Sequence, residues 1–256
     1  MAEYSTNITD LKVAIASILN QTYKNYEFII VDDCGINDLK KVVDEFNDPR
    51  ISIIKNDKNE GFVRSLNTAI EHSRGEYLVR MDTDDEVDPN RIQLLVNFIE
   101  KNPHYDVVSS RAIEFSGDEE FGIIGKQGEK GRKHVMRGDV PVHAASLIKK
   151  QAIKEVGGYK DYNRAEDLAL WCDLLIAGKR LYMLDDVLYR YRVNRGDYKK
   201  RSLKYRKGEL KARLYYYPKL GAGPLEYLRI LKSIAAGIMP ISAIRAYRNK
   251  FVTRKG

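Results

Sequence analysis

Short clusters of acidic residues are the part of this sequence best able to do chemistry. The densest is Met81-Asp-Thr-Asp-Asp85, which ends the apolar run Tyr77–Met81. Side chains of an extended chain alternate between two faces, so Asp82 and Asp84 can point to one spot. Carboxylates gathered there repel one another unless a cation neutralises them, and Mn²⁺ or Mg²⁺ would accept these oxygen ligands. The alternative is a solvated turn before a helix that Asp88-Pro89 opens.

Two other acidic pairs occupy positions where they can act on a ligand. Asp32-Asp33 follows the apolar run Phe28–Val31, and can bind the base or ribose of a nucleotide or simply form a turn. Glu166-Asp167 begins a predicted helix, where first-turn acids suit the helix dipole. The same dipole keeps a carboxylate ionised, as a general base must be. Both alternatives stay open for each pair.

Phosphate-binding glycine loops are missing from the sequence. Neither GxGxxG nor GxxxxGK[ST] occurs. This argues against a dehydrogenase and against a P-loop NTPase. If the chain binds a nucleotide diphosphate, a metal ion must take over the work of such a loop.

The elements that would position these acids alternate between strand and helix patterns over the first ~190 residues, as in α/β proteins. Apolar runs predict strands that end at Asp32, at Ile54 and at the Asp82 cluster, and a strand near Ala145–Ile148. Thr9-Asp10 is expected to cap the first helix. Residues 116–140 predict a loop or lid, and Val187–Val193 predicts an edge strand. We expect an open, mostly parallel sheet with flanking helices over residues 1–193.

The charge of the chain is divided unevenly. The net charge is +8, but residues 189–256 hold 19 Lys and Arg residues and 3 Asp and Glu residues. We therefore expect residues 194–256 to form a basic, amphipathic helical tail, which could contact lipid head groups, nucleic acid or a phosphorylated carrier. The uncharged stretch Ser233–Ile244 is too short to span a bilayer, so it either lies in a membrane interface or packs on the main domain. Since no nucleic-acid motif is recognisable, we expect no nucleic-acid partner.

Cysteine usage and the start of the sequence suggest a reducing compartment. Cys34 and Cys172 form no CxxC pair and are expected to be buried thiols. The first ten residues lack a basic segment followed by an apolar one, which a secretory signal would have. The chemistry is therefore expected in the cytoplasm, and the tail would place it at the inner face of the cell membrane.

Taken together, these segments resemble family 2 glycosyltransferases with the GT-A fold. The order of the acidic clusters and the residues between them match the pattern of that family over most of residues 1–193. The segments that carry the resemblance are Ala14–Cys34 (AIASILNQTYKNYEFIIVDDC), Ile51–Asn67 (ISIIKNDKNEGFVRSLN), Gly75–Arg91 (GEYLVRMDTDDEVDPNR), Asp106–Ser109 (DVVS) and Val156–Trp171 (VGGYKDYNRAEDLALW).

The resemblance implies a role for ten residues. Four are implied to bind the nucleotide-sugar, two to hold the metal, one to act as catalytic base and three to lie near the acceptor. In that order they are Glu3, Asp33, Arg64 and Asp82; Asp84 and Asp85; Asp167; and Glu166, His143 and Trp171. For His143 a packed or turn histidine is the alternative, and for Trp171 the alternative is core packing.

Three departures from the family pattern limit what the resemblance implies. The family usually opens with an apolar strand before a segment like Met1-Ala-Glu-Tyr4, so we expect the first strand to be largely missing. Cys34-Gly35 replaces the usual Gly-Ser. The QxxRW motif of processive members is absent, which predicts one sugar added per acceptor.

The sequence therefore predicts a metal-dependent, inverting glycosyltransferase. We expect its donor to be a nucleotide-diphospho-sugar linked to UDP, and its acceptor to be a saccharide or lipid-linked sugar in surface polysaccharide synthesis. The alternative is a non-catalytic protein that uses the GT-A fold for binding or regulation.

Overall fold

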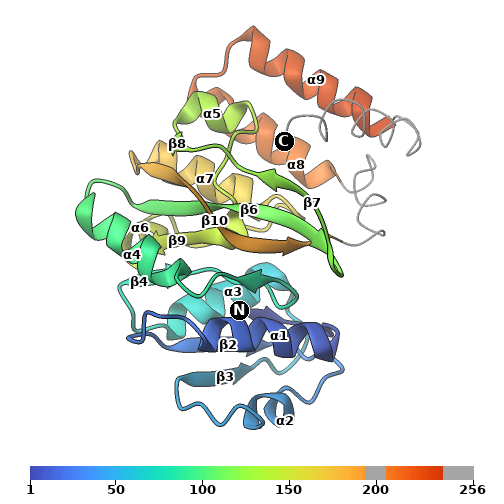
Figure 1. Ribbon diagram of the computed structural model, residues 1–256. Helices are drawn as coiled ribbons and strands as arrows, with labels where there is room; N and C mark the ends of the chain where they lie inside the picture. The colour runs from blue at the N-terminus through green and yellow to red at the C-terminus, as the bar shows by residue number, and fades with distance from the viewer. Residues whose placement is uncertain (194–205, 239–256) are drawn as a thin grey trace.

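The computed structural model describes residues 1–193 and 206–238. Its N-terminal part is a small sheet in the order β1-β2-β3, with both pairings parallel. Figure 1 shows these strands in blue, with α1 and α3 beside them and α2 at the far end. The strands are β1 (Ala2–Glu3), β2 (Phe28–Asp32) and β3 (Ile51–Lys55), and the helices are α1 (Ile8–Leu19), α2 (Leu39–Asp44) and α3 (Phe62–His72).

A second, seven-stranded sheet forms the centre of the molecule. Its path is β4-β9-β6-β10-β5, with β7 on β6 and β8 on β10. The strands are β4 (Tyr77–Val79), β5 (Glu86–Val87), β6 (Val107–Ser116), β7 (Glu119–Ile124), β8 (Gly128–Glu129), β9 (Ser146–Lys149) and β10 (Leu181–Arg192). Within this sheet only β6 and β10 pair in parallel, and the other pairings are antiparallel. The predicted α/β class is therefore confirmed, but the sheet is more antiparallel than we expected.

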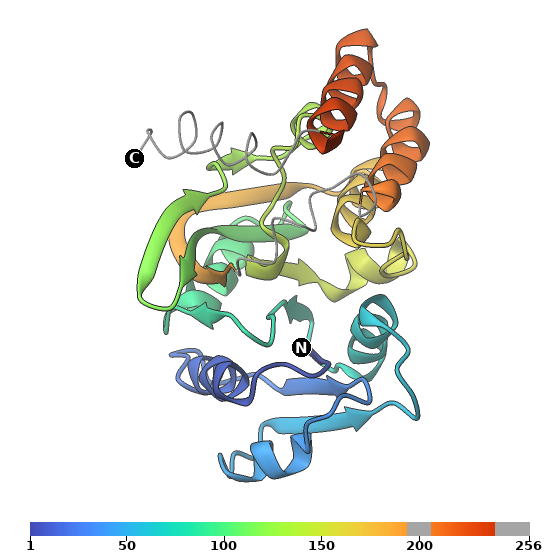
Figure 2. The same cartoon turned by 90° about the vertical axis from the view of Figure 1, so that its right-hand side faces the viewer.

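Helices lie around this sheet and continue into the tail. They are α4 (Arg91–Lys101), α5 (Arg132–Met136), α6 (Lys150–Glu155), α7 (Glu166–Ile176), α8 (Lys207–Tyr216) and α9 (Pro224–Ile238), with the short 3-10 helices η1 (His143–Ala145) and η4 (Pro218–Leu220). Figure 2 shows α8 and α9 at the end of the molecule opposite α2. Over residues 1–193 and 206–238, no helix is long and apolar enough to cross a membrane.

Two predicted helix caps are wrong by a few residues. The side chain of Asn7, rather than Thr9 or Asp10, caps α1 by accepting hydrogen bonds from the backbone amides of both those residues. Helix α4 begins at Arg91, and Asp88 lies outside it, where its carboxylate accepts from the amide of Asn90 at 2.8 Å. The sequence contains acceptable caps at neighbouring positions, and packing selects among them.

Two segments have more structure than their sequences predicted. Residues 116–140 are not a plain loop, because they contain β7, β8 and α5. The predicted edge strand at Val187–Val193 belongs to β10, which pairs with β6 on one side and with β5 and β8 on the other. The side chains of β7 and β8 are mostly exposed, so these strands contain charged residues and glycines in place of an apolar run.

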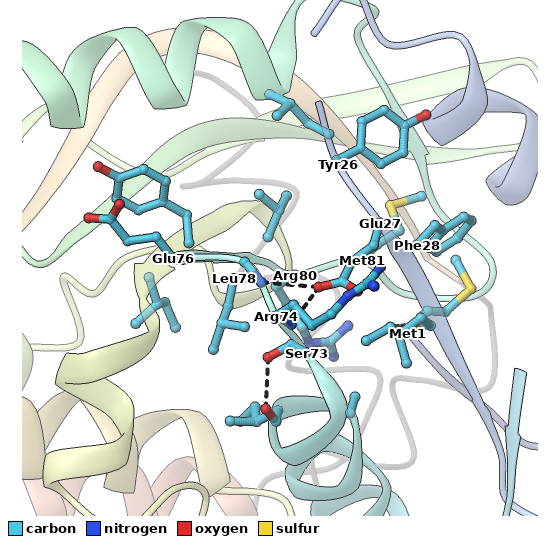
Figure 3. Close-up of a pocket in the computed structure, with 18 of the residues that line it drawn as sticks. Met1, Tyr26, Glu27, Phe28, Ser73, Arg74, Glu76, Leu78, Arg80 and Met81 are labelled. Carbon is cyan, nitrogen blue, oxygen red and sulfur yellow. Dashed lines mark hydrogen bonds and ion pairs between the residues drawn. The ribbon is translucent and has the colours of Figure 1, made fainter. Parts of the chain in front are cut away.

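A cavity of about 630 Å³ lies between β2 and β4. Figure 3 shows Phe28, Leu78 and Met81 around it, with Glu27 bonded to Arg74. Met1, which precedes β1, also lines the cavity, and β1 pairs with β2 at Val31 and Asp32. Arg80 and Tyr159 line the cavity, but the acidic clusters Asp82–Asp85 and Glu166-Asp167 do not.

The described part of the predicted tail packs against the main body. Ala212, Tyr216 and Tyr217 of the α8 region are fully buried in the same cluster as the apolar side chains of α7. The predicted division of the chain at residue 193 stays a prediction. The parts of the tail at residues 194–205 and 239–256 lie outside the described residues.

Candidate active site

The first acidic pair lies at the carboxyl end of β2 and organises the turn that follows β3. Asp33 is 3% exposed, and its Oδ1 accepts from the side-chain amide of Asn56 at 2.7 Å and the backbone amide of Glu60 at 2.8 Å. Its Oδ2 accepts from the backbone amide of Gly61 at 2.9 Å. Asp33 therefore fixes the start of α3, and any contact with a nucleotide base would use the carboxylate's remaining lone pairs.

Glu3 and Arg64, the other two residues implied to bind the nucleotide in this region, differ in burial. Glu3 is fully buried, with Oε1 accepting from the Thr6 amide and the Asn37 side chain, while Oε2 is buried without a hydrogen-bond partner in the described part of the chain. The side chain of Arg64 is 71% exposed and pairs with Glu60 at 3.3 Å. Arg64 is thus free to turn toward a phosphate.

The second cluster follows β4 and contains a buried ion pair. The Arg80 guanidinium contacts Asp82 Oδ1 at 2.7 Å, and the Arg80 side chain is only 7% exposed. Burial lowers the pKa of Arg80, but the charge and hydrogen bond of Asp82 together with Tyr159 and Tyr189 outweigh burial, so the net pKa is raised. Nε and Nη1 of Arg80 are buried without hydrogen-bond partners among the described residues. A buried cation with unused donors beside a carboxylate is typical of a functional site.

Asp84 and Asp85 differ in the hydrogen bonds that their carboxylates accept. Burial and then the charge of Asp82 raise the pKa of Asp84, whose backbone carbonyl accepts from Arg192 Nε at 2.6 Å. Asp85 is 1% exposed, and its two oxygens accept from the Tyr189 hydroxyl at 2.8 Å and the Arg192 amide at 2.7 Å. Burial followed by the charge of Asp82 raises the pKa of Asp85 well above its usual value. Of the two predicted metal ligands, the geometry therefore favours Asp84.

The side chains of Asp82 and Asp84 are partly exposed, whereas that of Asp85 is buried. Over the residues that the structure describes, no three His, Cys, Asp or Glu side chains are gathered in a metal-binding arrangement. Two carboxylates suit Mn²⁺ or Mg²⁺ when phosphate oxygens and water complete the coordination. Burial is the main cause that raises the pKa of Asp84, and the charge of Asp82 adds a repulsion that a bound cation would relieve.

The third acidic pair begins α7 as the sequence predicted. Glu166 and Asp167 are half-buried in its first turn. Asp167 Oδ1 accepts from the Leu168 amide at 2.6 Å. Burial is the main cause that raises the pKa of both carboxyls. A base with a raised pKa holds an abstracted proton more tightly, which suits the general-base role.

His143 and Trp171 belong to an aromatic group beneath this pair. The His143 ring is 2.8 Å from the Tyr159 hydroxyl through Nε2, and it meets the rings of Tyr159 and Trp171 edge to face. Burial and then Arg80 lower the pKa of His143 well below its usual value, so the ring is neutral. Trp171 is 0% exposed in the core, which favours the packing alternative for this residue.

Tyr159 lies near residues of both the second and the third acidic clusters. Burial raises its pKa, and the nearby charges that act on it are Arg80, Asp167, Glu166 and Asp82. Two hydrogen bonds of 2.9 Å join its backbone to the side chain of Asn67 on α3. Charges from the segment after β4 and from the start of α7 therefore both act on Tyr159.

Sequence reasoning missed Arg80, Tyr159 and Tyr189 in this site. A basic residue inside the apolar run Tyr77–Met81 was a usable signal for Arg80, since an arginine in a buried strand needs a charged partner. Nothing local indicated the two tyrosines among the 17 in the chain. Tyr189 contacts Asp85 across 104 positions of sequence.

Comparisons with known proteins identify the family of the chain. The family model described as Glycosyl transferase family 2 matches residues 7–157. The chain belongs to glycosyl transferase family 2. Of the two functions left open by the sequence, membership supports the glycosyltransferase over the non-catalytic binding protein.

Individual relatives cover nearly the whole chain. The putative glycosyltransferase EpsE of Bacillus subtilis is 31% identical over 94% of this chain and 89% of its own. A UDP-Gal:alpha-D-GlcNAc-diphosphoundecaprenol beta-1,3-galactosyltransferase of Escherichia coli is 30% identical over 96% of this chain and 91% of its own. The mannosyltransferase PcManGT of Pyrobaculum calidifontis, solved with GDP-Man and Mn²⁺, has a TM-score of 0.64 at 17% identity, covering 99% of this chain and 79% of its own. That structural likeness establishes the GT-A fold.

Proposed function

We propose that this glycosyltransferase moves one sugar from a UDP-sugar to a saccharide carried on a lipid diphosphate, with inversion at the anomeric carbon. The observation that carries the proposal is that Asp82, which pairs with Arg80, and Asp167 both lie near enough to Tyr159 for their charges to act on it. The carboxylates after β4 would face the departing diphosphate, and Asp167 would face the incoming hydroxyl. The relative that uses UDP-Gal and a diphosphoundecaprenol acceptor supports the choice of substrates.

On the donor side, the chain offers a base-binding turn and cations for the diphosphate. Asp33 shapes the turn and Glu3 presents the unpartnered Oε2 beside it. The exposed Arg64 can reach the phosphates, and Arg80 holds Asp82 in place. Asp82 and Asp84 would hold Mn²⁺ or Mg²⁺, which supplies positive charge against the leaving diphosphate when it is bound.

On the acceptor side, Asp167 is the base. It takes the proton of an acceptor hydroxyl as that oxygen bonds to the anomeric carbon of the donor sugar. The bond from that carbon to the diphosphate oxygen breaks, and its electron pair leaves with UDP. A single displacement of this kind inverts the anomeric centre. Glu166 and the neutral His143 lie beside the acceptor, and Trp171 supports His143 from the core.

The tail would bring the enzyme to its acceptor. α9 exposes Leu225, Leu228 and Leu231 by 67%, 58% and 60%, and residues 189–256 are strongly basic. A helix with an exposed apolar stripe and basic flanks binds an anionic membrane interface. We propose that residues 1–193 form the catalytic domain, that the tail makes peripheral contact, and that the enzyme works at the cytoplasmic face of the cell membrane.

The first test is a calorimetric titration of UDP with and without Mn²⁺. We expect Mn²⁺-dependent binding that is weakened at least tenfold in Asp84→Ala and retained in Asp118→Ala, which removes an exposed acid from the turn between β6 and β7. If the wild-type protein binds none of UDP, GDP and TDP, the proposed donor site is wrong.

The second test measures products from UDP-galactose or UDP-glucose and a diphospholipid-linked N-acetylglucosamine. The wild type should add one sugar with an inverted linkage, visible by NMR of the product. Asp167→Asn should lose about 10²–10⁴ in kcat while UDP still binds. Full turnover by that variant would remove Asp167 from its role.

A further inference from the structure

The beginning of α8 lies against the loop that precedes the proposed base. This loop, residues 161–165, leads directly into Glu166-Asp167 at the start of α7. Helix α8 lies beside α7 in both views of the molecule (Figures 1 and 2). Both helices lie beyond residue 157, where the match to the family model ends.

No side chain fits at Gly208 in the first turn of α8. A methyl group on its Cα would lie 1.6 Å from the carbonyl oxygen of Tyr162 and 2.4 Å from that of Asn163. Both obstacles are backbone atoms, so a rotamer change cannot remove the clash. Either the loop or the helix must move if the glycine is replaced.

The loop has a backbone that needs support from outside. Asn163 and Arg164 are consecutive left-handed residues, with φ of 48° and 75°. Left-handed conformations are unfavourable for residues with a Cβ, and persist where surrounding contacts impose them. The Asn163 amide donates to Asp161 Oδ1 at 2.7 Å, and Ala165 is 2% exposed. The loop is thus anchored at both ends and held against α8 in the middle.

Aromatic contacts join α8 to the loop and to α7. The Tyr162 ring lies 5.7 Å from the Tyr216 ring and 6.4 Å from the Tyr215 ring. The Tyr216 hydroxyl donates to Asp173 Oδ2 on α7 at 2.8 Å. A shift of α8 would therefore move the loop and α7 together.

We propose that α8 takes part in positioning the catalytic base: Gly208 lets the start of α8 lie against the loop that sets Asp167. Gly208 is a positioning residue, since it acts through Asp167 and touches no substrate. The proposal rests on the proposed role of Asp167, and it gives the first part of the tail a task besides membrane contact.

The first experiment compares Gly208→Ala with Lys207→Ala, an exposed neighbour in the same turn. UDP release from UDP-galactose gives kcat, and calorimetry gives the UDP dissociation constant. We expect Gly208→Ala to lower kcat at least tenfold with UDP binding changed less than twofold, and Lys207→Ala to match the wild type. Wild-type kcat in Gly208→Ala would overturn the proposal, as would equal losses of kcat and UDP binding, which indicate general damage.

The second experiment uses Asp167→Asn to separate this inference from the proposed function. If Asp167→Asn is inactive and Gly208→Ala behaves as wild type, the proposed function stands and this inference fails. If Asp167→Asn is fully active, the proposed function itself fails.

Discussion

Two arginines on neighbouring segments show how burial decides what one residue does. Arg80 and Arg64 each pair with an acid, but the side chain of Arg80 is 7% exposed and that of Arg64 is 71% exposed. An exposed pair is worth little because water and salt screen it. Breaking a buried pair leaves a poorly solvated charge, here the 25% exposed Asp82.

Arg80→Ala should accordingly lower the free energy of unfolding by about 2–3 kcal/mol, a value reduced for the partial exposure of Asp82. Arg64→Ala should change it by less than about 1 kcal/mol. Urea unfolding of both variants measures the difference. Equal effects would mean that the Arg80–Asp82 pair is solvated in solution.

The pH dependence of turnover also belongs to single residues. Because the pKa of Asp167 is raised, the carboxyl stays protonated up to a higher pH than a free aspartate, and a protonated base is inactive. We expect kcat to fall as pH falls through that raised pKa, giving an acid limb above the usual pKa of about 3.9. Glu166→Gln should keep this limb; its disappearance would assign the titration to Glu166 instead.

At the scale of elements, β10 holds the segment after β4 in place. The Tyr189 hydroxyl accepts from the Asp82 amide at 3.2 Å and donates to Asp85 at 2.8 Å, and the Arg192 amide donates to Asp85 as well. One strand therefore fixes both the backbone and a buried side chain of the Asp82–Asp85 segment. No local sequence pattern predicted that the carboxyl half of β10 would hold the second acidic cluster.

Tyr189→Phe tests this connection. It leaves the buried carboxyl of Asp85 with one hydrogen bond fewer, which should cost about 1–3 kcal/mol of stability. The loosened segment should also weaken Mn²⁺-dependent UDP binding several-fold. Tyr182→Phe, on the same strand but outside these hydrogen bonds, is the matched control in unfolding and calorimetry. Unchanged UDP affinity in Tyr189→Phe would show that β10 does not position the site.

The whole molecule separates its proposed tasks along its length. The parallel sheet of β1, β2 and β3 lies at one end, the converging acids lie in the middle, and α9 lies at the other end (Figures 1 and 2). This layout would let α9 rest on a membrane while the nucleotide half faces water. The exposed leucines of α9 are the residues on which that arrangement depends.

Vesicle co-sedimentation with anionic phosphatidylglycerol tests the layout. Leu228→Glu combined with Leu231→Glu should reduce binding at least fivefold, because two charges replace apolar side chains in the interface. Leu94→Glu, a change at a 37% exposed leucine on α4, should bind like the wild type. If the wild type and both variants bind the vesicles equally, the leucines of α9 do not contribute to membrane binding.

The sequence by itself determined what depends on neighbours close in the chain. The apolar run Phe28–Val31 followed by acids predicted β2 and its polar end, and the pattern after Glu166 predicted α7. Alternation of strands and helices predicted the α/β class, and the order of the motifs predicted the family, which the comparisons confirm. These features follow from local periodicity and from the edge of a sheet where parallel strands end.

Only the tertiary structure decided how each side chain is used, because burial and pairing join distant parts of the chain. Asp84 and Asp85 are adjacent and identical in type, yet Tyr189 and the Arg192 amide occupy the oxygens of Asp85 alone. Trp171 is in the core because the helices α6 and α8 contribute side chains to the same apolar cluster as its own helix α7, and the His143 ring of η1 meets it edge to face. Gly208 is needed because a loop some 45 positions earlier crosses the start of α8. No local pattern carries such contacts, since each depends on where another segment lies after folding.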